Sequence, residues 1–296
     1  MAYKSGFVTI IGKPNVGKST FLNCVLGEKV SIVSPKPQTT RNRIRGILTG
    51  EDYQIVFQDT PGLVKKTTKL SEFMQRSIEL ASSDSDIVLF MTDASRGIGR
   101  EEEELLQSYA QRPLIVLVNK IDEAKPEQVM PLLQRLSQMG LKEIFPISAR
   151  TGKNVDLVLK KIVELLPEGE KYYPDDMVTD RTQRFMVSEI IREKTLHFYE
   201  QEVPHGIGVN VTGFEFNEEK GITVIDAEIY CEKDSHKAII IGKQGAGLKK
   251  VGAEARKEIE NLVGSKVFLT LWVKVKEKWR DNELVLNELG YSKKNA

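Results

Sequence analysis

Residues 12 to 19 read Gly12-Lys13-Pro14-Asn15-Val16-Gly17-Lys18-Ser19 and fit the pattern G-x-x-x-x-G-K-[ST]. An apolar run, Phe7 to Ile11, precedes this segment, and a helical run that begins at Thr20 follows it. Glycines in such a loop let backbone N–H groups close around phosphates, while the lysine reaches the β and γ oxygens and the serine hydroxyl can bind Mg²⁺. Chance produces the pattern in roughly one chain of this length in a hundred, so it predicts a nucleotide-phosphate site over Gly12 to Thr20.

Apolar segments alternate with helical patterns over the first 166 residues. Strand–helix alternation is typical of a doubly wound α/β sheet with strands buried on both faces. Ile44–Leu48 breaks this rhythm because only a short polar turn separates it from Tyr53, so a hairpin should make the mostly parallel sheet mixed. The predicted strands are Phe7–Ile11, Tyr53–Phe57, Ile87–Met91, Leu114–Val118 and Ile144–Pro146, and the predicted helices are Leu70–Ala81, Glu101–Tyr109, Val129–Met139 and Val155–Leu166.

Two fragments at strand ends predict the base that is bound. Asn119-Lys120-Ile121-Asp122 follows the strand Leu114–Val118, at the edge where ligands of open α/β sheets bind. A carboxylate there accepts hydrogen bonds from guanine N1–H and N2–H₂, a donor pair that adenine lacks, so Asp122 selects GTP over ATP. Ser148 and Ala149 follow another strand and can offer backbone N–H groups to guanine O6.

A third fragment, Asp59-Thr60-Pro61-Gly62, ends the strand Tyr53–Phe57. There Asp59 can reach the shell of a bound Mg²⁺, and the Gly62 N–H can meet the γ-phosphate. Together the fragments resemble the translational GTPase-like superfamily of P-loop proteins over about the first 166 residues. The resemblance implies that Pro37-Gln38-Thr39-Thr40-Arg41 is the first switch, in which we favour Thr40 over Thr39 as the threonine that binds Mg²⁺ in the GTP state.

The same resemblance assigns the remaining roles. Lys18, Thr40 and Gly62 are the expected catalytic residues, and Ser19, Thr40 and Asp59 the expected Mg²⁺ ligands. Leu63 stands where many GTPases carry a water-positioning Gln, so intrinsic hydrolysis should be slow. Asn15 resembles the asparagine of relatives that bind a potassium ion in place of an arginine finger. Potassium is therefore a hypothesis for a second cation.

After Leu166 the sequence changes character. A polar, acidic stretch with prolines at 167 and 174 predicts a linker, and the order that follows, αββααβ, predicts a different, α+β module. The expected domains are residues 1–170, a linker over 171–181, a second domain over 182–280 and a C-terminal helix and tail over 281–296. Trp272, flanked by Leu271 and Val273, is expected in the core, whereas Trp279 is open to packing or to stacking on a base.

Gly242-Lys243-Gln244-Gly245 joins two helical runs of this module. Four lysines and no acid lie between Ser235 and Ala253, as a clamp on a single-stranded nucleic-acid backbone requires. A helix-turn-helix with a solvated lysine face is the alternative. The context resembles a KH domain of the bacterial topology, type II, which implies an apolar groove along Ile239, Ile240, Ile241 and Leu248; the expected RNA-binding residues are Ile240, Ile241, Gly242, Lys243, Gln244, Gly245, Lys249 and Lys250.

Composition restricts the wider possibilities. The 296 residues carry 43 Lys and Arg against 42 Asp and Glu, a net charge of +1 that excludes a polybasic chain. No apolar window reaches transmembrane length and no cleavable leader is visible. Cys24 and Cys231 match no metal-ligand spacing, suit a reducing cytosol and are expected to be small buried side chains.

A GTPase domain followed by one type II KH domain resembles the Era family of GTPases over nearly the whole chain. That resemblance implies a cytoplasmic GTP/GDP switch for small-subunit assembly that binds the single-stranded 3′ end of small-subunit ribosomal RNA in its GTP state. It also implies a monomer that associates loosely with the inner face of the membrane. The γ-phosphate would hold Thr40 and Gly62, and so order the loops Ser34–Ile44 and Leu63–Lys69 against the KH domain.

Three functional hypotheses remain open at this point. GTP turnover could time RNA engagement, the protein could hold nucleotide with hardly any turnover, or the KH domain could localise a GTPase whose effector is a protein. Leu63 favours slow turnover and does not separate the first two. A tRNA-modifying or double-GTPase ribosome factor is the runner-up, disfavoured by the single P-loop and by the absence of a cysteine-bearing C-terminal motif.

Overall fold

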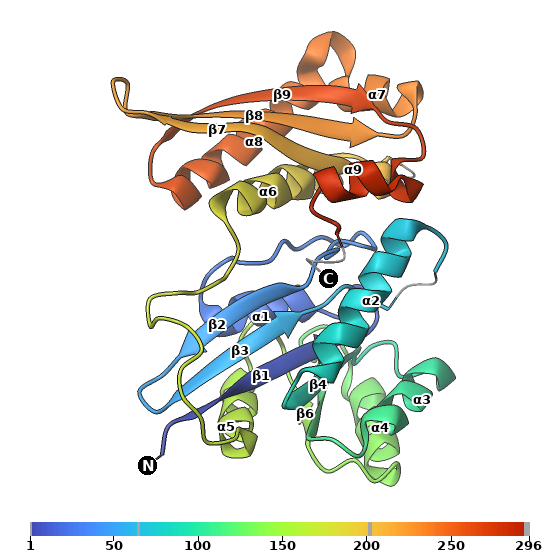
Figure 1. Cartoon of the computed structure of the whole chain (residues 1–296). Coiled ribbons are helices and arrows are strands. Elements are labelled where there is room, and N and C mark those ends of the chain that lie inside the picture. The colour runs from blue at the N-terminus through green and yellow to red at the C-terminus, as the bar shows by residue number, and fades with distance from the viewer. Residues whose placement is uncertain (1, 64–65, 201–202, 293–296) are drawn as a thin grey trace.

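The computed structural model describes residues 2–63, 66–200 and 203–292. Its first half is a six-stranded sheet of order β2-β3-β1-β4-β5-β6, in which only β2 runs antiparallel to its neighbour (Figure 1). The predicted mixed, mostly parallel sheet is therefore confirmed. The strands are β1 Lys4–Ile11, β2 Ile44–Thr49, β3 Tyr53–Asp59, β4 Ile87–Asp93, β5 Leu114–Asn119 and β6 Ile144–Pro146.

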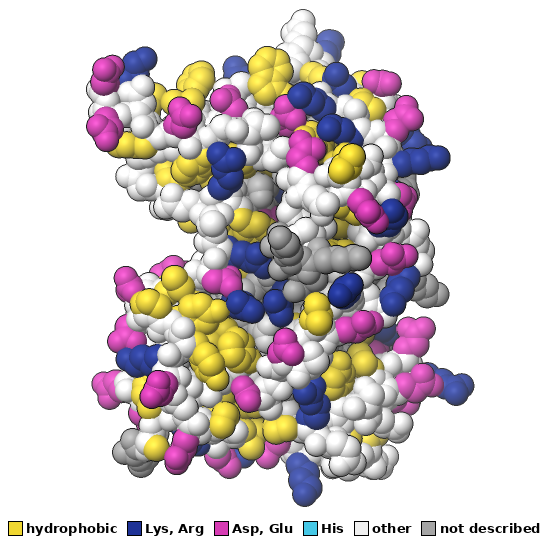
Figure 2. Space-filling view, in the orientation of Figure 1, with side chains coloured by type: hydrophobic (Ala, Val, Ile, Leu, Met, Phe, Trp, Pro, Cys, Tyr) yellow, Lys and Arg dark blue, Asp and Glu magenta, His cyan; other side chains and the backbone are white. Residues whose placement is uncertain are grey.

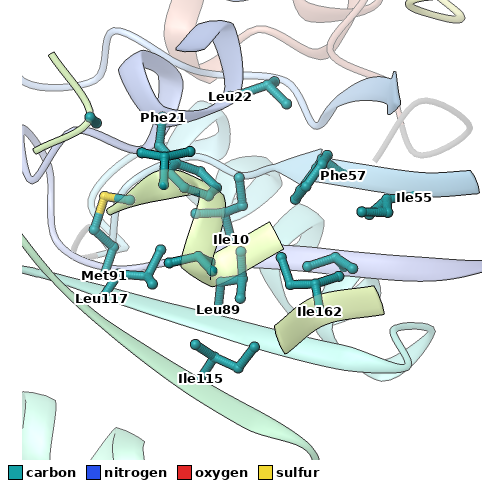
Figure 3. Close-up of a cluster of buried hydrophobic side chains, with 14 of the residues drawn as sticks. Ile10, Phe21, Leu22, Ile55, Phe57, Leu89, Met91, Ile115, Leu117 and Ile162 are labelled. Carbon is teal, nitrogen blue, oxygen red and sulfur yellow. The ribbon is translucent and has the colours of Figure 1, made fainter. Parts of the chain in front are cut away.

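Helices cover both faces of this sheet because the strands are apolar on both sides. One core contains Phe21 and Ile162 from the helices α1 and α5 (Figure 3), and the other contains Leu106 and Leu136 from α3 and α4. The helices are α1 Lys18–Leu26, α2 Lys69–Ser83, α3 Arg100–Tyr109, α4 Pro126–Gln138 and α5 Val155–Leu165.

The second half is a three-stranded sheet of order β7-β8-β9 that packs helices on one face. β8 and β9 are parallel, and their connection contains α7, the loop with Gly242 and Gly245, and α8. The predicted α+β module is confirmed. Its elements are α6 Gln183–Phe198, β7 Gly208–Asn217, β8 Ile222–Cys231, α7 Asp234–Ile241, α8 Ala246–Val263, β9 Lys266–Val275 and α9 Glu283–Glu288, with 3₁₀ turns η1 Pro204–Gly206, η2 Lys243–Gly245 and η3 Trp279–Asp281.

The predicted linker lies along the first domain. The Ile47 N–H donates to Val178 O at 2.8 Å, and the Tyr172 N–H donates to Gln54 Oε1 at 2.8 Å. The two halves also share a small core, in which Phe73 of α2 packs with Trp279 and Tyr291. Figure 2 shows an indentation between the halves at the left edge of this view. The hydrogen bonds to Ile47 and Gln54 fix the linker between the two sheets to the first domain.

Two predictions about individual side chains were wrong. Trp272 lies on the open face of β9 and is 60% exposed, so it is not a core residue. Cys24 is only partly buried, whereas Cys231 is fully buried as predicted, and both thiols are free. Trp279 is completely buried and its Nε1–H donates to Gly206 O at 2.8 Å, which leaves its indole packed rather than available for a base.

No helix in the described part of the chain is both long enough and apolar enough to cross a membrane.

Candidate functional site

The loop after β1 has the backbone that its glycines predict. Gly12 and Gly17 have φ values of 154° and 105°, and a Cβ at Gly12 would lie 2.2 Å from Met91 O. A Cβ at Gly17 would lie 2.2 Å from Asn119 Nδ2, so the loop packs directly against the base-reading segment. Because no side chain fits at either position, this loop requires glycine at both.

Lys18 begins α1 and its side chain is buried inside the loop. Its Nζ donates to Gly12 O at 3.1 Å and to Lys13 O at 3.0 Å. Burial lowers the pKa of Lys18 to about 8, although nearby Asp59 acts to raise it. The Lys18 ammonium group is thus held at the point where the loop would surround phosphates.

Ser19, Thr40 and Asp59, the predicted metal ligands, are brought together. Ser19 Oγ lies 2.9 Å from Thr40 Oγ1 and donates to Asp59 Oδ2 at 2.7 Å. Ser31 Oγ also donates to Asp59 Oδ2, at 2.9 Å, while the buried Asp59 Oδ1 has no protein partner. Burial raises the pKa of Asp59, an effect that Lys18 and the hydroxyl groups oppose.

Thr39 is oriented differently from its neighbour. Its hydroxyl donates to Lys36 O at 2.6 Å, inside its own loop, so it does not join the Ser19 cluster. The described residues contain no cluster of three His, Cys, Asp or Glu side chains arranged to hold a metal. The hydroxyl-rich group around Asp59 is therefore the candidate cation site that geometry supports.

The base-reading residues form one connected unit with the phosphate loop. Asn119 Nδ2 donates to Val16 O at 2.7 Å, and the Ala149 N–H donates to Asn119 Oδ1 at 2.9 Å. Lys120 Nζ donates to Asp93 Oδ2 at 2.7 Å. This arrangement places the ends of β5 and β6 beside the loop after β1.

Asp122 retains the charge that a guanine-reading carboxylate needs. The Ser148 hydroxyl, followed by Arg150, holds the pKa of Asp122 below its ordinary value. Arg150 contacts the Asp122 carboxylate and also donates to Glu123 Oε1 at 2.7 Å. An ionised Asp122 accepts hydrogen bonds and donates none, which matches the two donors of the guanine edge.

A cavity of about 480 Å³ joins these parts. Of the predicted nucleotide-binding set, the residues that line it are Pro14, Asn15, Gly17, Lys18, Ser19, Thr20, Gly62, Asn119, Lys120, Asp122 and Ala149, together with Thr40 from the switch. The other predicted members are not among the residues that line it: Gly12, Lys13, Val16, Asp59, Thr60, Pro61, Leu63 and Ser148. Lys13, for example, pairs with buried Glu102 at 2.7 Å, and the Thr60 hydroxyl donates to Ile10 O at 2.7 Å.

Sequence reasoning missed several residues of the site. Arg150 directly follows Ser148-Ala149, a position that could have drawn attention to it. Ser31, Val33 and Arg96 carry no recognisable signal, because the folding of the chain alone brings them to Asp59 or to the cavity wall.

The loop between α7 and α8 is a tight turn in which three of four residues have a positive φ. Gly242, Gln244 and Gly245 have φ values of 71°, 52° and 79°. A Cβ at Gly242 would lie 2.9 Å from Gly247 N, which explains the glycine there. The side chains of Lys243, Gln244, Lys249 and Lys250 are exposed around this turn.

Ile240 requires a correction among the predicted RNA contacts. Its side chain is fully buried in the core of the second domain, so it is closed to a ligand. Ile239 is exposed, and Ile241 and Leu248 are partly buried, so these three remain for an apolar groove. The helix period places Ile239 and Ile240 on different sides of α7, which the run of three isoleucines concealed.

The sheet order, the phosphate loop and the base-reading unit together define a P-loop GTPase domain. It is joined to a second domain of an RNA-binding class. The family described as "50S ribosome-binding GTPase" matches residues 7–120, and the KH domain family matches residues 202–280. The chain belongs to the Era family of GTPases. Proteins called GTPase Era in Clostridium botulinum and Caldanaerobacter subterraneus are each 52% identical to it over 295 residues, 99% of this chain and at least 99% of each relative.

Solved structures agree over the full length. Aquifex aeolicus Era bound to GDP and AlF₄⁻ superposes with a TM-score of 0.93 at 41% identity, covering 98% of this chain and 99% of that one. An Era structure with MgGDPNP and nucleotides 1506–1542 of 16S ribosomal RNA gives a TM-score of 0.94 at 41% identity over the same shares. The predicted family, fold and GTPase activity are thus confirmed.

Proposed function

We propose that this protein is a GTP-driven switch that binds the single-stranded 3′ end of small-subunit ribosomal RNA in its GTP state, during assembly of the small ribosomal subunit. The proposal is supported by the Era structure that holds both MgGDPNP and nucleotides 1506–1542 of 16S ribosomal RNA. One observation carries it for this chain: the short segment that lines the nucleotide cavity also contacts the KH domain.

That segment is Thr39-Thr40-Arg41. Thr40 Oγ1 reaches Ser19, while the carbonyl group of Thr39 accepts a hydrogen bond from Arg192 of α6. Arg41 is buried and its guanidinium donates to Ile207 O at 2.5 Å. A change at Thr40 therefore moves groups that the second domain binds on either side of it.

The second loop that the γ-phosphate would order is Leu63–Lys69, of which residues 64 and 65 lie outside the described part of the chain.

Ser19, Thr40 and Asp59 fit a magnesium ion. All three offer oxygen atoms, which are the ligands that Mg²⁺ prefers, and the unpartnered, buried Asp59 Oδ1 leaves one acceptor available. A bound Mg²⁺ would neutralise charge on the β and γ phosphates. The chain itself supplies the Lys18 ammonium group and the backbone N–H of Gly62, which packs against Pro14.

Slow intrinsic turnover is part of the proposal. Leu63 packs against the core beside α3 and α4 and has no group that could orient water. Asn15 has a φ of 64° and its Nδ2 donates to Pro35 O at 2.7 Å, which leaves its Oδ1 as an acceptor for a cation near the phosphates. We propose potassium there, and equal turnover in sodium and potassium salts would refute it.

The RNA contact is assigned to the exposed lysines around the turn at Gly242. Lys243, Lys249 and Lys250 would bind phosphates, while Ile239, Ile241 and Leu248 would contact bases. The test is binding of a labelled single-stranded RNA that copies the 3′ end of small-subunit ribosomal RNA, at fixed salt, with a GTP analogue and then with GDP.

Tight binding that weakens in GDP supports the switch. Lys243→Ala should weaken binding in both states, whereas Lys257→Ala on the exposed side of α8 serves as the matched control. Equal binding in the two nucleotide states would overturn the switch and favour an RNA anchor whose effector is a protein.

The wider setting is proposed from the family. We place the protein in the cytoplasm as a monomer, in loose contact with the inner face of the membrane. Two free cysteines suit a reducing compartment. Flotation with anionic lipid vesicles and light scattering test the membrane contact and the monomeric state.

A further inference from the structure

Helix α6 also contacts a second part of the cavity wall, at Val33, through residues in its C-terminal half. Glu193 Oε1 accepts a hydrogen bond from the Val33 N–H at 2.9 Å, and His197 Nε2 lies 3.2 Å from Val33 O. Val33 belongs to the cavity wall. Val33 is therefore held through both its N–H and its carbonyl group by the second domain.

Glu193 is built to make this contact. Its side chain is 2% exposed and accepts from Lys29 Nζ at 2.5 Å. Burial acts to raise the pKa of Glu193, but the donors Lys29 and Val33 hold it below the ordinary value. A buried, ionised carboxylate is tolerated only where its donors stay in place, so the position of Val33 and that of α6 depend on each other.

The end of α6 contacts the Gly242–Gly245 turn. Tyr199, at the C-cap, is buried and donates its hydroxyl to Ile240 O at 2.7 Å, two residues before Gly242. A Cβ at Gly247, on the other side of the turn, would lie 2.9 Å from the Tyr199 hydroxyl. The ring of Phe198 lies 4.4 Å from Lys250 Nζ. Residues on both sides of the turn thus contact these two aromatic side chains.

We infer that α6 couples the cavity wall at Val33 to the RNA-binding turn, with Glu193 as the residue that contacts Val33 and Tyr199 as the residue that positions the turn. The inference rests on the proposed function and names how that function is regulated. About 9 Å of helix separate the two residues, since each residue adds 1.5 Å. A helix of this length moves as one body, so a displacement at Val33 reaches Ile240 without a change inside α6.

The experiment uses the full chain and two variants. Tyr199→Phe removes only the hydroxyl, and its matched control is Tyr230→Phe, a buried tyrosine of the same domain that bonds Glu288 instead. Glu193→Ala removes the contact with Val33, and its control is Glu258→Ala, which removes a carboxylate from the same ion cluster at Lys29. Amide hydrogen exchange over residues 242–246 is measured without RNA, and RNA affinity is measured with a GTP analogue and with GDP.

Coupling predicts that both variants raise exchange in the turn by about fivefold, the effect of one lost hydrogen bond, while both controls leave it unchanged. Tyr199→Phe should also weaken RNA binding about fivefold, and Glu193→Ala should reduce the ratio of affinities between the two nucleotide states. The double variant should lower that ratio no further than Glu193→Ala alone.

Unchanged exchange in the turn of Glu193→Ala would overturn the coupling, even if RNA binding by the wild type depends on nucleotide. If the wild type binds no RNA, the proposed function fails instead, and the exchange measurement still decides whether α6 connects the two sites.

Discussion

Thr39 and Thr40 are neighbours with separate partners. The hydroxyl of Thr40 faces Ser19, whereas that of Thr39 stays in its own loop and its carbonyl group binds Arg192. The peptide unit between Thr39 and Thr40 therefore lies between the Ser19 cluster and Arg192 of α6. Chemically identical side chains at adjacent positions give a matched pair for experiment.

Thr40→Ala should reduce GTP turnover at least tenfold, because it removes a ligand of the proposed magnesium site. Thr39→Ala removes a hydrogen bond within the loop and no contact with the Ser19 cluster, so it should change turnover less than threefold. Single-turnover hydrolysis at saturating Mg²⁺ measures both. The assignment of Thr40 is wrong if the two variants lose activity equally.

Lys18 should make nucleotide affinity depend on pH. Its pKa is lowered to about 8 by burial, and phosphates bind the ammonium form. Below pH 8 Lys18 is already mostly in the ammonium form. Above pH 8 most of the lysine is neutral and must take up a proton when GTP binds. GTP affinity should therefore stay constant from pH 7 to 7.5 and then fall, approaching tenfold per pH unit as the pH rises beyond 8.

Calorimetric titration at pH 7, 8 and 9 measures this dependence. Guanosine monophosphate is the control, because it keeps the base and lacks the β and γ phosphates that Lys18 would contact. A GTP affinity that is constant over the whole range would contradict the pKa of Lys18.

The sequence predicted those residues whose role depends on local pattern. The phosphate loop, Asp122 and the turn at Gly242 follow from short motifs beside strands and helices. Trp272 was misjudged although the strand period contains the answer: if Leu271 and Val273 face the core, the residue between them faces outward. Arg150, Ser31 and Glu193 act through partners far away in sequence, which no local pattern reveals.

At the scale of elements, the first turn of α2 receives a carboxylate from the other domain. The backbone N–H of Lys69, the first residue of α2, donates to Asp281 Oδ1 at 3.0 Å. Acidic groups at helix N-termini accept hydrogen bonds from free N–H groups and interact favourably with the positive end of the helix dipole. The C-terminal segment thus stabilises a helix of the GTPase domain.

Asp281→Ala should destabilise this interface by about 1 kcal/mol. Urea unfolding followed by the fluorescence of buried Trp279, in a Trp272→Phe background, reports on it directly. Glu104→Ala, which breaks an exposed pair in α3, should shift the midpoint by much less. Equal shifts of the urea midpoint in the two variants would mean that Asp281 stabilises the protein no more than an exposed ion pair does.

Helices and strands of both halves were predictable because their apolar periods are clear. The contacts between the halves were not, since α2, η3 and α9 meet through residues more than 200 positions apart, such as Lys69 and Asp281. The predicted linker likewise gave no sign that it would bond along Ile47 and Gln54.

For the whole molecule, nucleotide and RNA should affect each other by the same factor. If the GTP analogue tightens RNA binding, saturating RNA must tighten binding of the analogue equally, and factors of about 5 to 150 are usual for such coupling. The measurement is the affinity for the analogue with and without RNA, using Lys243→Ala to weaken RNA binding alone. An RNA that leaves analogue affinity unchanged would exclude the switch.

The small core shared by α2 and the C-terminal segment has a consequence for biosynthesis. The six-stranded sheet needs only the residues up to Pro146, whereas the cluster of Leu70, Phe73 and Met74 is not covered until Trp279 and Tyr291 have been made. At translation rates of roughly 5–20 residues per second, the face of α2 stays open for roughly 7 to 30 seconds after that sheet can form. During this interval a nascent chain presents an apolar helix face to chaperones that the finished protein conceals.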